Sequence, residues 1–317
     1  FDGYASIAGG AVSVERGSAI NDTQSVWRNC SAPEGGILDA ASSDAAVILF
    51  GTQLFGVGPM QLARRPLVGG CVHLADSVAA WLTSTRLQDC FAGTAGAIHA
   101  HSAVRLSVVD SSITHSGCSN AVCSGGAIWA HGQAQVMLLR SELRHCHAMT
   151  SEGKGGCIAA GTDTVLELVH SVVSSGSAYI SGGCVAATSG RALLKLFNTT
   201  ITDCQAGGEL DGLSSTGSGG CIFSAGGSVQ LLGANTISMC SAMSSPGRGG
   251  DGGGVAIIAG GAQNSSEGLA AFSPSLIVPA CPVVCSLLQP GDACTAPPPS
   301  TTSAFSEWAT AEHPGDE

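Results

Sequence analysis

The sequence is poor in charge, in aromatic residues and in long apolar runs. Charged residues make up 11% of the 317 positions, aromatic residues make up 4%, and lysine occurs only at Lys154 and Lys195. Helical bundles and coiled coils need many Glu, Lys and Arg side chains on their solvent-facing sides, so this scarcity argues against both. No run of 18 or more apolar residues occurs, which argues against direct membrane insertion.

Net charge and hydropathy exclude two further classes of protein. The net charge is −11 at pH 7 and the sequence pI is about 5.1, whereas a nucleic-acid-binding surface is basic. The hydrophobic content of 44% and the mean hydropathy of +0.31 argue against a disordered chain. The chain begins at Phe1 rather than at methionine, so we expect either a removed signal peptide or a piece of a longer protein.

Glycine is abundant, with 45 residues, and it marks an internal repeat. A glycine motif, usually two glycines followed by a small residue or Cys and an aliphatic residue, begins at positions 9, 35, 69, 95, 125, 155, 182, 219 and 252. A second motif follows about twenty residues later and often places Cys three positions after an apolar residue, as in Leu87–Cys90. Short alternating runs such as 104–108 lie between the two motifs. Each repeat of 26–37 residues therefore predicts about three short strands separated by turns.

Repeats of this length bury a continuous core only when they stack on one another. We therefore predict an all-β protein, a single-stranded right-handed parallel β-helix of about nine coils, over residues 1–270. A Cys-containing C-terminal cap is expected over 271–294, and an extended Pro/Ser/Thr-rich tail or linker over 295–317. A β-propeller is the alternative fold, but its blades are longer and carry Trp-Asp or similar signatures that this sequence lacks.

Two columns of aliphatic residues are expected to point into the core of the helix. The first column follows the glycine motif and contains Val72, Ile98, Ile128, Ile158, Val185, Ile222 and Val255. The second column belongs to the later motif and contains Leu87, Ile113, Leu143, Val173, Ile201 and Ile237.

The two motifs together resemble the GGA[IV]…FxxN repeats of polymorphic outer-membrane proteins, a family of autotransported adhesins. The resemblance covers roughly residues 8–258; in the second half Cys replaces most of the Asn, and Leu or Ile replaces Phe. It implies a β-helix and a place at the cell surface, but it does not transfer an adhesin's partner. The tail, with its run Pro297–Ser303, resembles in composition the Pro/Ser-rich stretches of algal hydroxyproline-rich wall glycoproteins.

Fourteen cysteines, an even number, suggest a disulfide framework and an oxidising compartment. The spacing predicts the pairs Cys71–Cys90, Cys184–Cys204, Cys221–Cys240, Cys146–Cys157 and Cys118–Cys123. The remaining cysteines, Cys30, Cys281, Cys285 and Cys294, are also predicted to form disulfides, and Cys30 has a neighbouring subunit or module as a possible partner. A metal site at Cys281 and Cys285 is disfavoured because no second matched pair follows. Spacing does not determine connectivity, and a stack of buried, reduced cysteines is the alternative.

Four Asn-x-Ser/Thr triplets predict N-glycosylation at Asn21, Asn29, Asn198 and Asn264. Together with the cysteines, they favour an extracellular or cell-surface glycoprotein that reaches its place by secretion. The tail reads as an extended stalk that could carry O-linked glycans.

Titratable residues give little sign of catalysis. β-Helix polysaccharide lyases and hydrolases need clustered acids, and no repeat contains an Asp-Asp pair, so we predict no catalytic residues, no cofactor and no enzyme activity. Asp89, His115 and His145 occupy equivalent positions on consecutive coils and form a candidate site for a divalent metal ion. His73 and His99 form a similar pair.

The sequence thus predicts an extracellular structural or adhesive glycoprotein module. The β-helix would be a stiff spacer that assembles with copies of itself or with other surface glycoproteins into a surface fibre, an appendage or a cell-wall layer. The alternative is a carbohydrate-active β-helix enzyme, a polysaccharide lyase or glycoside hydrolase, which a carboxylate cluster on one face would favour.

Overall fold

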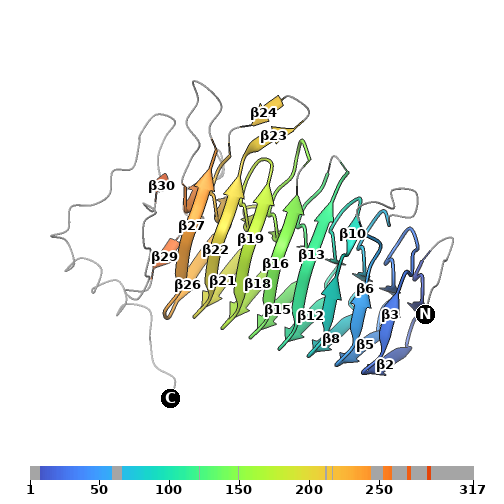
Figure 1. Ribbon diagram of the computed structural model, residues 1–317. Helices are drawn as coiled ribbons and strands as arrows, with labels where there is room; N and C mark the ends of the chain where they lie inside the picture. Colours follow the sequence, from blue (N-terminus) through green and yellow to red (C-terminus); the bar gives the residue numbers. More distant parts are fainter. Residues whose placement is uncertain are drawn as a thin grey trace, which may run out of the picture.

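The computed structural model describes residues 8–58, 66–120, 122–148, 150–210, 213–215, 217–243, 253–258, 270–272 and 284–286. In these segments the protein is all-β and contains no helix, and its strands stack in parallel into a β-solenoid (Figure 1). The part of the chain described here contains no helix long and apolar enough to cross a membrane. The predicted parallel β-helix is therefore confirmed as a fold class.

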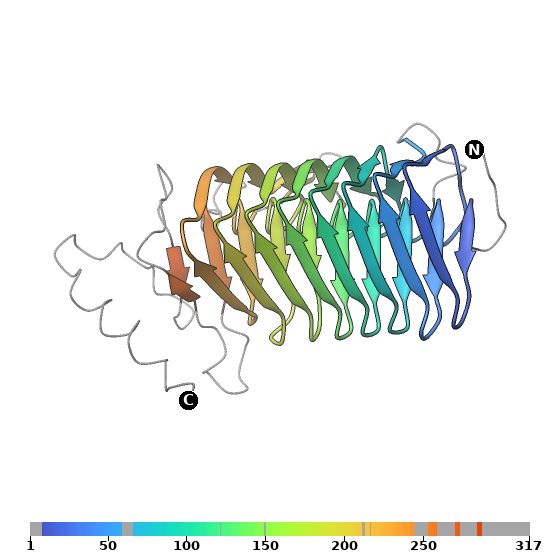
Figure 2. The ribbon, with the colours of Figure 1, turned by 90° about the horizontal axis from the view of Figure 1, so that it is seen from below.

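Three parallel sheets run along the solenoid, and Figure 2 shows their strands side by side. The first sheet has the order β1 (Val12–Val14), β4 (Leu38–Ala41), β7 (Val72–Ala75), β11 (Ile98–His101), β14 (Ile128–His131), β17 (Ile158–Ala160), β20 (Val185–Ala187), β25 (Ile222–Ala225), β28 (Val255–Ile258) and β30 (Val284–Ser286). The second sheet has the order β2 (Ala19–Thr23), β5 (Ala46–Phe50), β8 (Ala79–Thr83), β12 (Arg105–Val109), β15 (Gln135–Leu139), β18 (Val165–Val169), β21 (Leu193–Phe197), β26 (Ser228–Leu232) and β29 (Ala270–Phe272).

The third sheet completes the cross-section. Its order is β3 (Val26–Arg28), β6 (Gln53–Phe55), β9 (Arg86–Gln88), β13 (Ser112–Cys118), β16 (Glu142–Ala148), β19 (Val172–Ala178), β22 (Thr200–Ala206) and β27 (Thr236–Ala242), and the short β10 (Phe91–Ala92) also pairs with β13. A small antiparallel hairpin, β23 (Gly208–Leu210) with β24 (Leu213–Ser215), stands out from the stack (Figure 1).

The number of turns is somewhat smaller than predicted. In the described residues eight strand triplets run from β1–β3 to β25–β27, so the chain makes about seven turns from the first triplet to the last, against the nine or so coils expected. β28 and β29 extend the first and second sheets beyond the last triplet. The predicted cap over 271–294 lies outside the described residues except at 271–272 and 284–286, and the tail over 295–317 lies outside them entirely.

Glycine is strongly favoured where neighbouring coils touch, although Ala95 takes the first position of one motif with a φ of +55°. The first glycine of the motif has a positive φ, +53° at Gly35 and +69° at Gly125, a region that side chains with a Cβ rarely adopt. The second glycine has no space for a side chain, because a Cβ on Gly156 would lie 2.0 Å from the carbonyl oxygen of Gly183 on the next coil. The glycine motif therefore marks a corner at which backbones stack directly on one another.

The core is one continuous aliphatic stack inside the three sheets. Both predicted columns are present, in register from coil to coil; Ile98, for example, pairs with Val72 on one side and Ile128 on the other. Members of both columns are at most 1% exposed. Complete burial of such side chains contributes roughly 1.5–3 kcal/mol each relative to exposure, and each coil achieves it only against its neighbours.

A buried column of polar residues, which the sequence analysis did not identify, lines the corner between the second and third sheets. The column contains Thr52, Thr85, Ser111, Ser141, Ser171, Thr199 and Asn235. Ser111 is representative: its Oγ accepts a hydrogen bond from the backbone nitrogen of Thr85 at 2.9 Å and donates one to the carbonyl oxygen of Val109 at 2.7 Å. Such contacts satisfy backbone groups that the ladder leaves unpaired at a buried corner.

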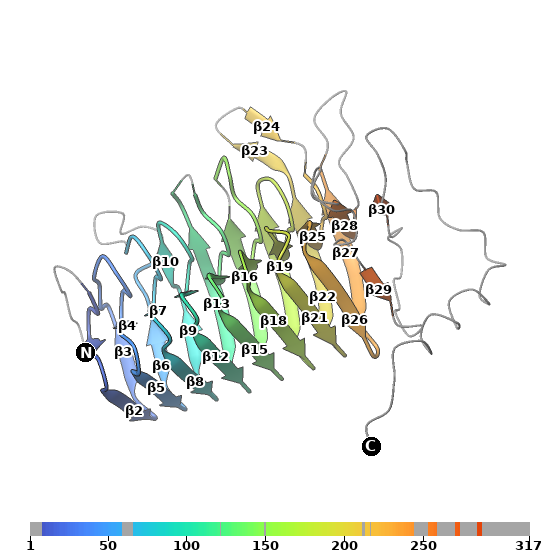
Figure 3. The same ribbon diagram turned by 180° about the vertical axis from the view of Figure 1, so that it is seen from behind.

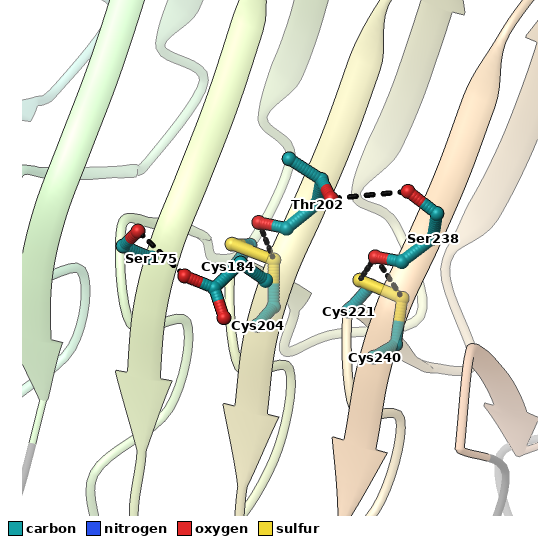
Figure 4. Close-up of a disulfide and its surroundings, with 8 residues drawn as sticks. Ser175, Cys184, Thr202, Cys204, Cys221, Ser238 and Cys240 are labelled. Carbon is teal, nitrogen blue, oxygen red and sulfur yellow. Dashed lines mark hydrogen bonds between the residues drawn. A yellow bond between two sulfur atoms is a disulfide. The ribbon is translucent and has the colours of Figure 1, made fainter.

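Four of the predicted disulfides are present. They are Cys71–Cys90, Cys118–Cys123, Cys184–Cys204 and Cys221–Cys240. Figure 4 shows the Cys184–Cys204 and Cys221–Cys240 disulfides on adjacent coils. Three of the four join the glycine motif of a coil to the later motif of the same coil, so they brace the cross-section rather than linking one coil to the next.

The predicted Cys146–Cys157 disulfide is wrong for this structure, because both residues are buried free thiols. Burial and then the neighbouring Cys146 raise the pKa of the Cys157 thiol well above its usual value. Cys146 and Cys157 lie on successive coils, and the position that pairs within each coil holds Ala127 for Cys146 and Gly176 for Cys157. The intra-coil geometry of the other disulfides is therefore not available to them.

The other predicted cysteine pairings remain predictions. Cys30 is buried, and its Sγ donates a hydrogen bond to the carbonyl oxygen of Arg28 at 3.2 Å. Cys281 and Cys294 lie outside the described residues, and only the backbone of Cys285 is described, in β30.

Candidate functional site: a histidine cluster on the first sheet

Four histidines gather on the outer face of the first sheet, the side of the molecule on which Figure 3 labels β4 and β7. His73 and His99 hold the second position of β7 and β11 and are adjacent in the register. His101 and His131 hold the fourth position of β11 and β14 and are adjacent in the same way. Alternate residues of a strand share a face, and Val72 belongs to the core, so the four imidazoles project from the opposite, outer side.

The four rings form a compact group. The ring centroids of His73 and His99 are 5.3 Å apart and nearly parallel, and those of His101 and His131 repeat this arrangement at 5.3 Å. The centroids of His99 and His101 are 4.9 Å apart. Trp129 lies beside the group, with its ring centroid 4.4 Å from that of His131. The cluster is therefore bounded on one side by an aromatic ring.

Two diagonal contacts bring ring nitrogens together. The Nε2 atoms of His73 and His101 are 3.1 Å apart, and those of His99 and His131 are 3.0 Å apart. Each contact joins the second position of one strand to the fourth position of the next strand. In both contacts the two histidines lie on adjacent strands and differ by two positions along the strand.

Carboxylates flank the cluster on the side of β4. Asp39 lies beside His73 in the register, and its Oδ1 accepts a hydrogen bond from His73 Nδ1 at 2.7 Å. Potential ligand atoms of Glu34, Asp39 and His73 also lie within 4.8 Å of one another. Because Asp39 holds the Nδ1 proton of His73, the Nε2 lone pair of His73 faces His101.

Burial keeps three of the imidazoles uncharged at neutral pH. The pKa of His99 is lowered well below its usual value, first by desolvation and then by the charges of His73, His101 and His131. Desolvation and then the charge of His101 lower the pKa of His131 to about 4. The pKa of His101 is lowered by desolvation and then by His73, although Asp76 and Glu34 oppose the shift. Each ring thus retains an unprotonated nitrogen that can act as a ligand.

The metal candidate predicted from the sequence lies elsewhere, on the third sheet. Asp89 directly follows β9, His115 lies within β13, and His145 lies within β16. Asp89, His115 and His145 are stacked there, with φ of +54°, +52° and +54°. The rings of His115 and His145 stack at 4.9 Å, and both residues are exposed. In the described segments, His, Cys, Asp and Glu ligand atoms converge within 4.8 Å in groups of three only around His73, not around these three residues. The structure confirms the column but does not bring its ligand atoms together.

Sequence analysis identified His73 and His99 as a pair but missed His101, His131 and Asp39. A signal for the two histidines was present: the spacing His-x-His at 99–101 places both side chains on one strand face, and His131 follows His101 by one 30-residue repeat. No such pattern marks Asp39, whose proximity to His73 depends on strand register.

The predicted glycosylation sites differ in exposure. Asn21, on β2, and Asn29, at a corner after β3, are exposed. Asn198 is half-buried, and its Oδ1 accepts a hydrogen bond from the backbone nitrogen of Ala234 at 2.7 Å. Asn264 lies outside the described residues. Occupancy at all four positions stays a prediction.

Comparison of the chain with protein-family models, with curated proteins and with solved structures finds no match.

Proposed function

We propose that the protein is a stiff spacer module of an extracellular structural or adhesive layer. The observation that carries this proposal is the uninterrupted stack, in which three parallel ladders join each coil to the next around one core. Such a stack resists bending because each coil contacts its neighbours along all three sheets. We infer the right-handed winding expected from the sequence, since crossover connections between parallel strands are right-handed in about 98% of cases.

The disulfides support an extracellular location, because they persist in oxidising compartments and are rare in the cytosol. Three of them close loops of similar size, with sequence separations of 19, 20 and 19. A loop of this size contributes roughly 3 kcal/mol to stability in the chain-entropy description. Disulfides placed at intervals along the stack suit a protein that keeps its folded structure outside the cell.

Contacts with neighbouring copies would use the outer face of the second sheet. The last position of its five-residue strands forms an apolar stripe over Val109, Leu139, Val169, Phe197 and Leu232, and Phe50 lies beyond it on the far side of Thr83. Phe50 is 47% exposed and Phe197 is 40% exposed. Burying such a stripe against a second copy removes apolar surface from water, a main driving force of protein association.

A carbohydrate-active enzyme is the second candidate, and one observation favours it. A groove of about 320 Å³ crosses the second sheet and is lined by residues that include Trp81, Arg105, Gln135 and Glu167. An aromatic ring beside polar groups suits a sugar. Glu167, however, is the single carboxylate of the lining and is bound to Lys195 at 2.9 Å, whereas hydrolysis commonly requires two carboxylates across the bond. The groove thus supports sugar binding better than cleavage.

Sedimentation and electron microscopy of the purified, glycosylated chain test the spacer proposal. We expect rods that associate as concentration rises, and we expect Phe50→Asp combined with Phe197→Asp to raise the association midpoint about tenfold or more. Gln53→Asp, an exposed position on the third sheet, is the matched control and leaves association unchanged. Rods that stay monomeric at every concentration, or cleavage of a polysaccharide by the wild type, would overturn the proposal.

A further inference from the structure

We propose that the histidine cluster binds one divalent transition-metal ion, with His73, His99 and His101 as ligands and Zn²⁺ as the ion that fits best. The potential ligand atoms of these three residues lie within 4.8 Å of one another. They come from two adjacent strands of a rigid sheet, β7 and β11, and not from a loop. A site of this kind goes beyond a spacer role and is independent of it.

The distances suit a small four-coordinate ion. Zn–N bonds of about 2.0–2.1 Å place two ligand nitrogens of a tetrahedral site about 3.3 Å apart. The Nε2 atoms of His73 and His101 are 3.1 Å apart, so an ion between them requires little movement. His99 stands next to both rings, with centroid distances of 5.3 Å to His73 and 4.9 Å to His101. Solvent would supply the fourth ligand, because His101 is only half-buried.

Neighbouring groups already hold two of the ligands in the orientation that a metal needs. Asp39 Oδ1 accepts from His73 Nδ1 at 2.7 Å, the carboxylate–histidine arrangement that commonly supports a metal-bound imidazole. Ser102 Oγ lies 2.9 Å from His101 Nδ1 and can accept a hydrogen bond from it in the same way. When both Nδ1 atoms carry the proton, both Nε2 lone pairs point into the gap between the rings.

The cluster without an ion leaves ring nitrogens poorly satisfied. Each Nε2–Nε2 contact can hold a single proton, and His99 Nδ1 is buried with no hydrogen-bond partner in the described part of the chain. Buried polar atoms in native proteins are mostly paired, and an unpaired one is often found where a ligand belongs. A cation shared by the rings would replace the proton in the His73–His101 contact.

The chemistry of the ligands selects the class of metal. Imidazole nitrogens suit Zn²⁺, Cu²⁺ and Ni²⁺, whereas Mg²⁺ and Ca²⁺ prefer carboxylate, carbonyl and water oxygens. Asp39 is already bound to His73 and acts from outside the proposed ligand set. We therefore expect the site to take Zn²⁺ and to ignore Ca²⁺ and Mg²⁺.

Calorimetric titration of the chelator-treated full chain with Zn²⁺ tests the proposal, using protein without a histidine tag. We expect one ion per chain. Asp39→Asn should weaken binding by about 10–100-fold, the usual effect of losing an outer partner, and His101→Gln should weaken it further. His145→Gln, from the exposed histidine stack, is the matched control and should bind Zn²⁺ as the wild type does.

Failure of the wild type to bind Zn²⁺, or equal binding by wild type and His101→Gln, would overturn the proposal. So would loss of binding in His145→Gln. If His101→Gln does not fold, X-ray absorption of the zinc-loaded wild type decides the question without a variant. Three imidazoles around the ion support the site, whereas sulfur ligands or an all-oxygen shell exclude it.

Discussion

His73 donates a hydrogen bond through Nδ1 to Asp39 Oδ1 at 2.7 Å, and each side chain is only 7% exposed. The contact joins β4 to β7 and lies on the outer face of the first sheet, where side chains of a solenoid usually meet water. A buried pair of this kind orients both partners, and the loss of either one leaves a polar group without a partner in a desolvated place.

Replacing Asp39 should therefore destabilise the protein even without any metal. We expect Asp39→Ala to lower the free energy of unfolding by about 2–3 kcal/mol, because the Nδ1–H group of His73 loses its acceptor while it stays buried. Asp39→Asn keeps an acceptor oxygen and should cost less. Urea denaturation in the presence of a chelator measures both values; equal values for the two variants would show that the hydrogen bond is not the cause.

The cluster should also make stability depend on pH. The pKa of His131 is lowered to about 4 and that of His99 is lowered well below its usual value, so the unfolded chain takes up these protons first as the pH falls. Between about pH 6.5 and pH 4 the unfolded state binds more protons, and the free energy of unfolding therefore decreases as the pH falls. Below that window the contribution of His131 is constant.

Chelator-treated protein followed by chemical denaturation across this pH range measures the dependence. His73, His101 and His131 act on His99, and His101 acts on His131, whereas the acids Glu34 and Asp76 act on His101, where they oppose the shift. His131→Gln should flatten the slope between pH 6.5 and pH 4. An unchanged slope in this variant would assign the dependence to other groups.

The thiols of Cys146 and Cys157 should resist modification in the folded protein. Burial raises the pKa of the Cys157 thiol well above its usual value, and the adjacent Cys146 raises it further, so little reactive thiolate forms. We expect iodoacetamide to leave both residues unlabelled under native conditions and to label both in denaturant, as read by peptide mass mapping. A Cys146–Cys157 disulfide in the purified protein would show that the thiols oxidise despite their burial.

Glycine at the stacked corner should be close to indispensable. A Cβ at position 156 would meet the carbonyl oxygen of Gly183 at 2.0 Å, so Gly156→Ala forces two coils apart. We expect a loss of about 3–5 kcal/mol in the free energy of unfolding or failure to fold. Gly58→Ala is the control, because a Cβ there has nothing within 4 Å. Similar thermal stability of the two variants would contradict the close-packed corner.

Removing one brace should weaken the stack by a measurable but limited amount. Replacing Cys184 and Cys204 together with alanine opens a loop with a sequence separation of 20 residues, and we expect a loss of about 2–4 kcal/mol in the free energy of unfolding. Thermal and urea denaturation of the double variant measure it. If stability does not change, the stack rather than the disulfide holds this coil together.

The regular parts of the fold were predictable because each depends on a short stretch of sequence that recurs in every repeat. The glycine motif predicted the corners, and Val72, Ile98 and Ile128 predicted a core column. Equivalent positions in successive coils lie side by side, so a residue that is buried in one coil is buried in the next. Three disulfides followed from the same logic, because both cysteines occupy fixed positions within one coil.

The Cys146–Cys157 pair was predicted wrongly. Its outcome depends on how one coil sits against the next, which spacing along the chain does not report. The polar column represented by Ser111 was overlooked for a similar reason: a hydroxyl that bonds the backbone of the preceding coil looks like an ordinary turn residue in the sequence.

The sequence alone determined the winding of this protein into stacked parallel strands, because a 26–37-residue period of glycine corners and aliphatic positions can bury its core in few other ways. Only the tertiary structure decided which polar side chains lie in contact. Strand register placed Asp39 against His73 and set His101 diagonally across from His73, although more than twenty residues separate each of these partners from His73. Cross-strand neighbours depend on alignment between coils, and that alignment is a property of the packed stack.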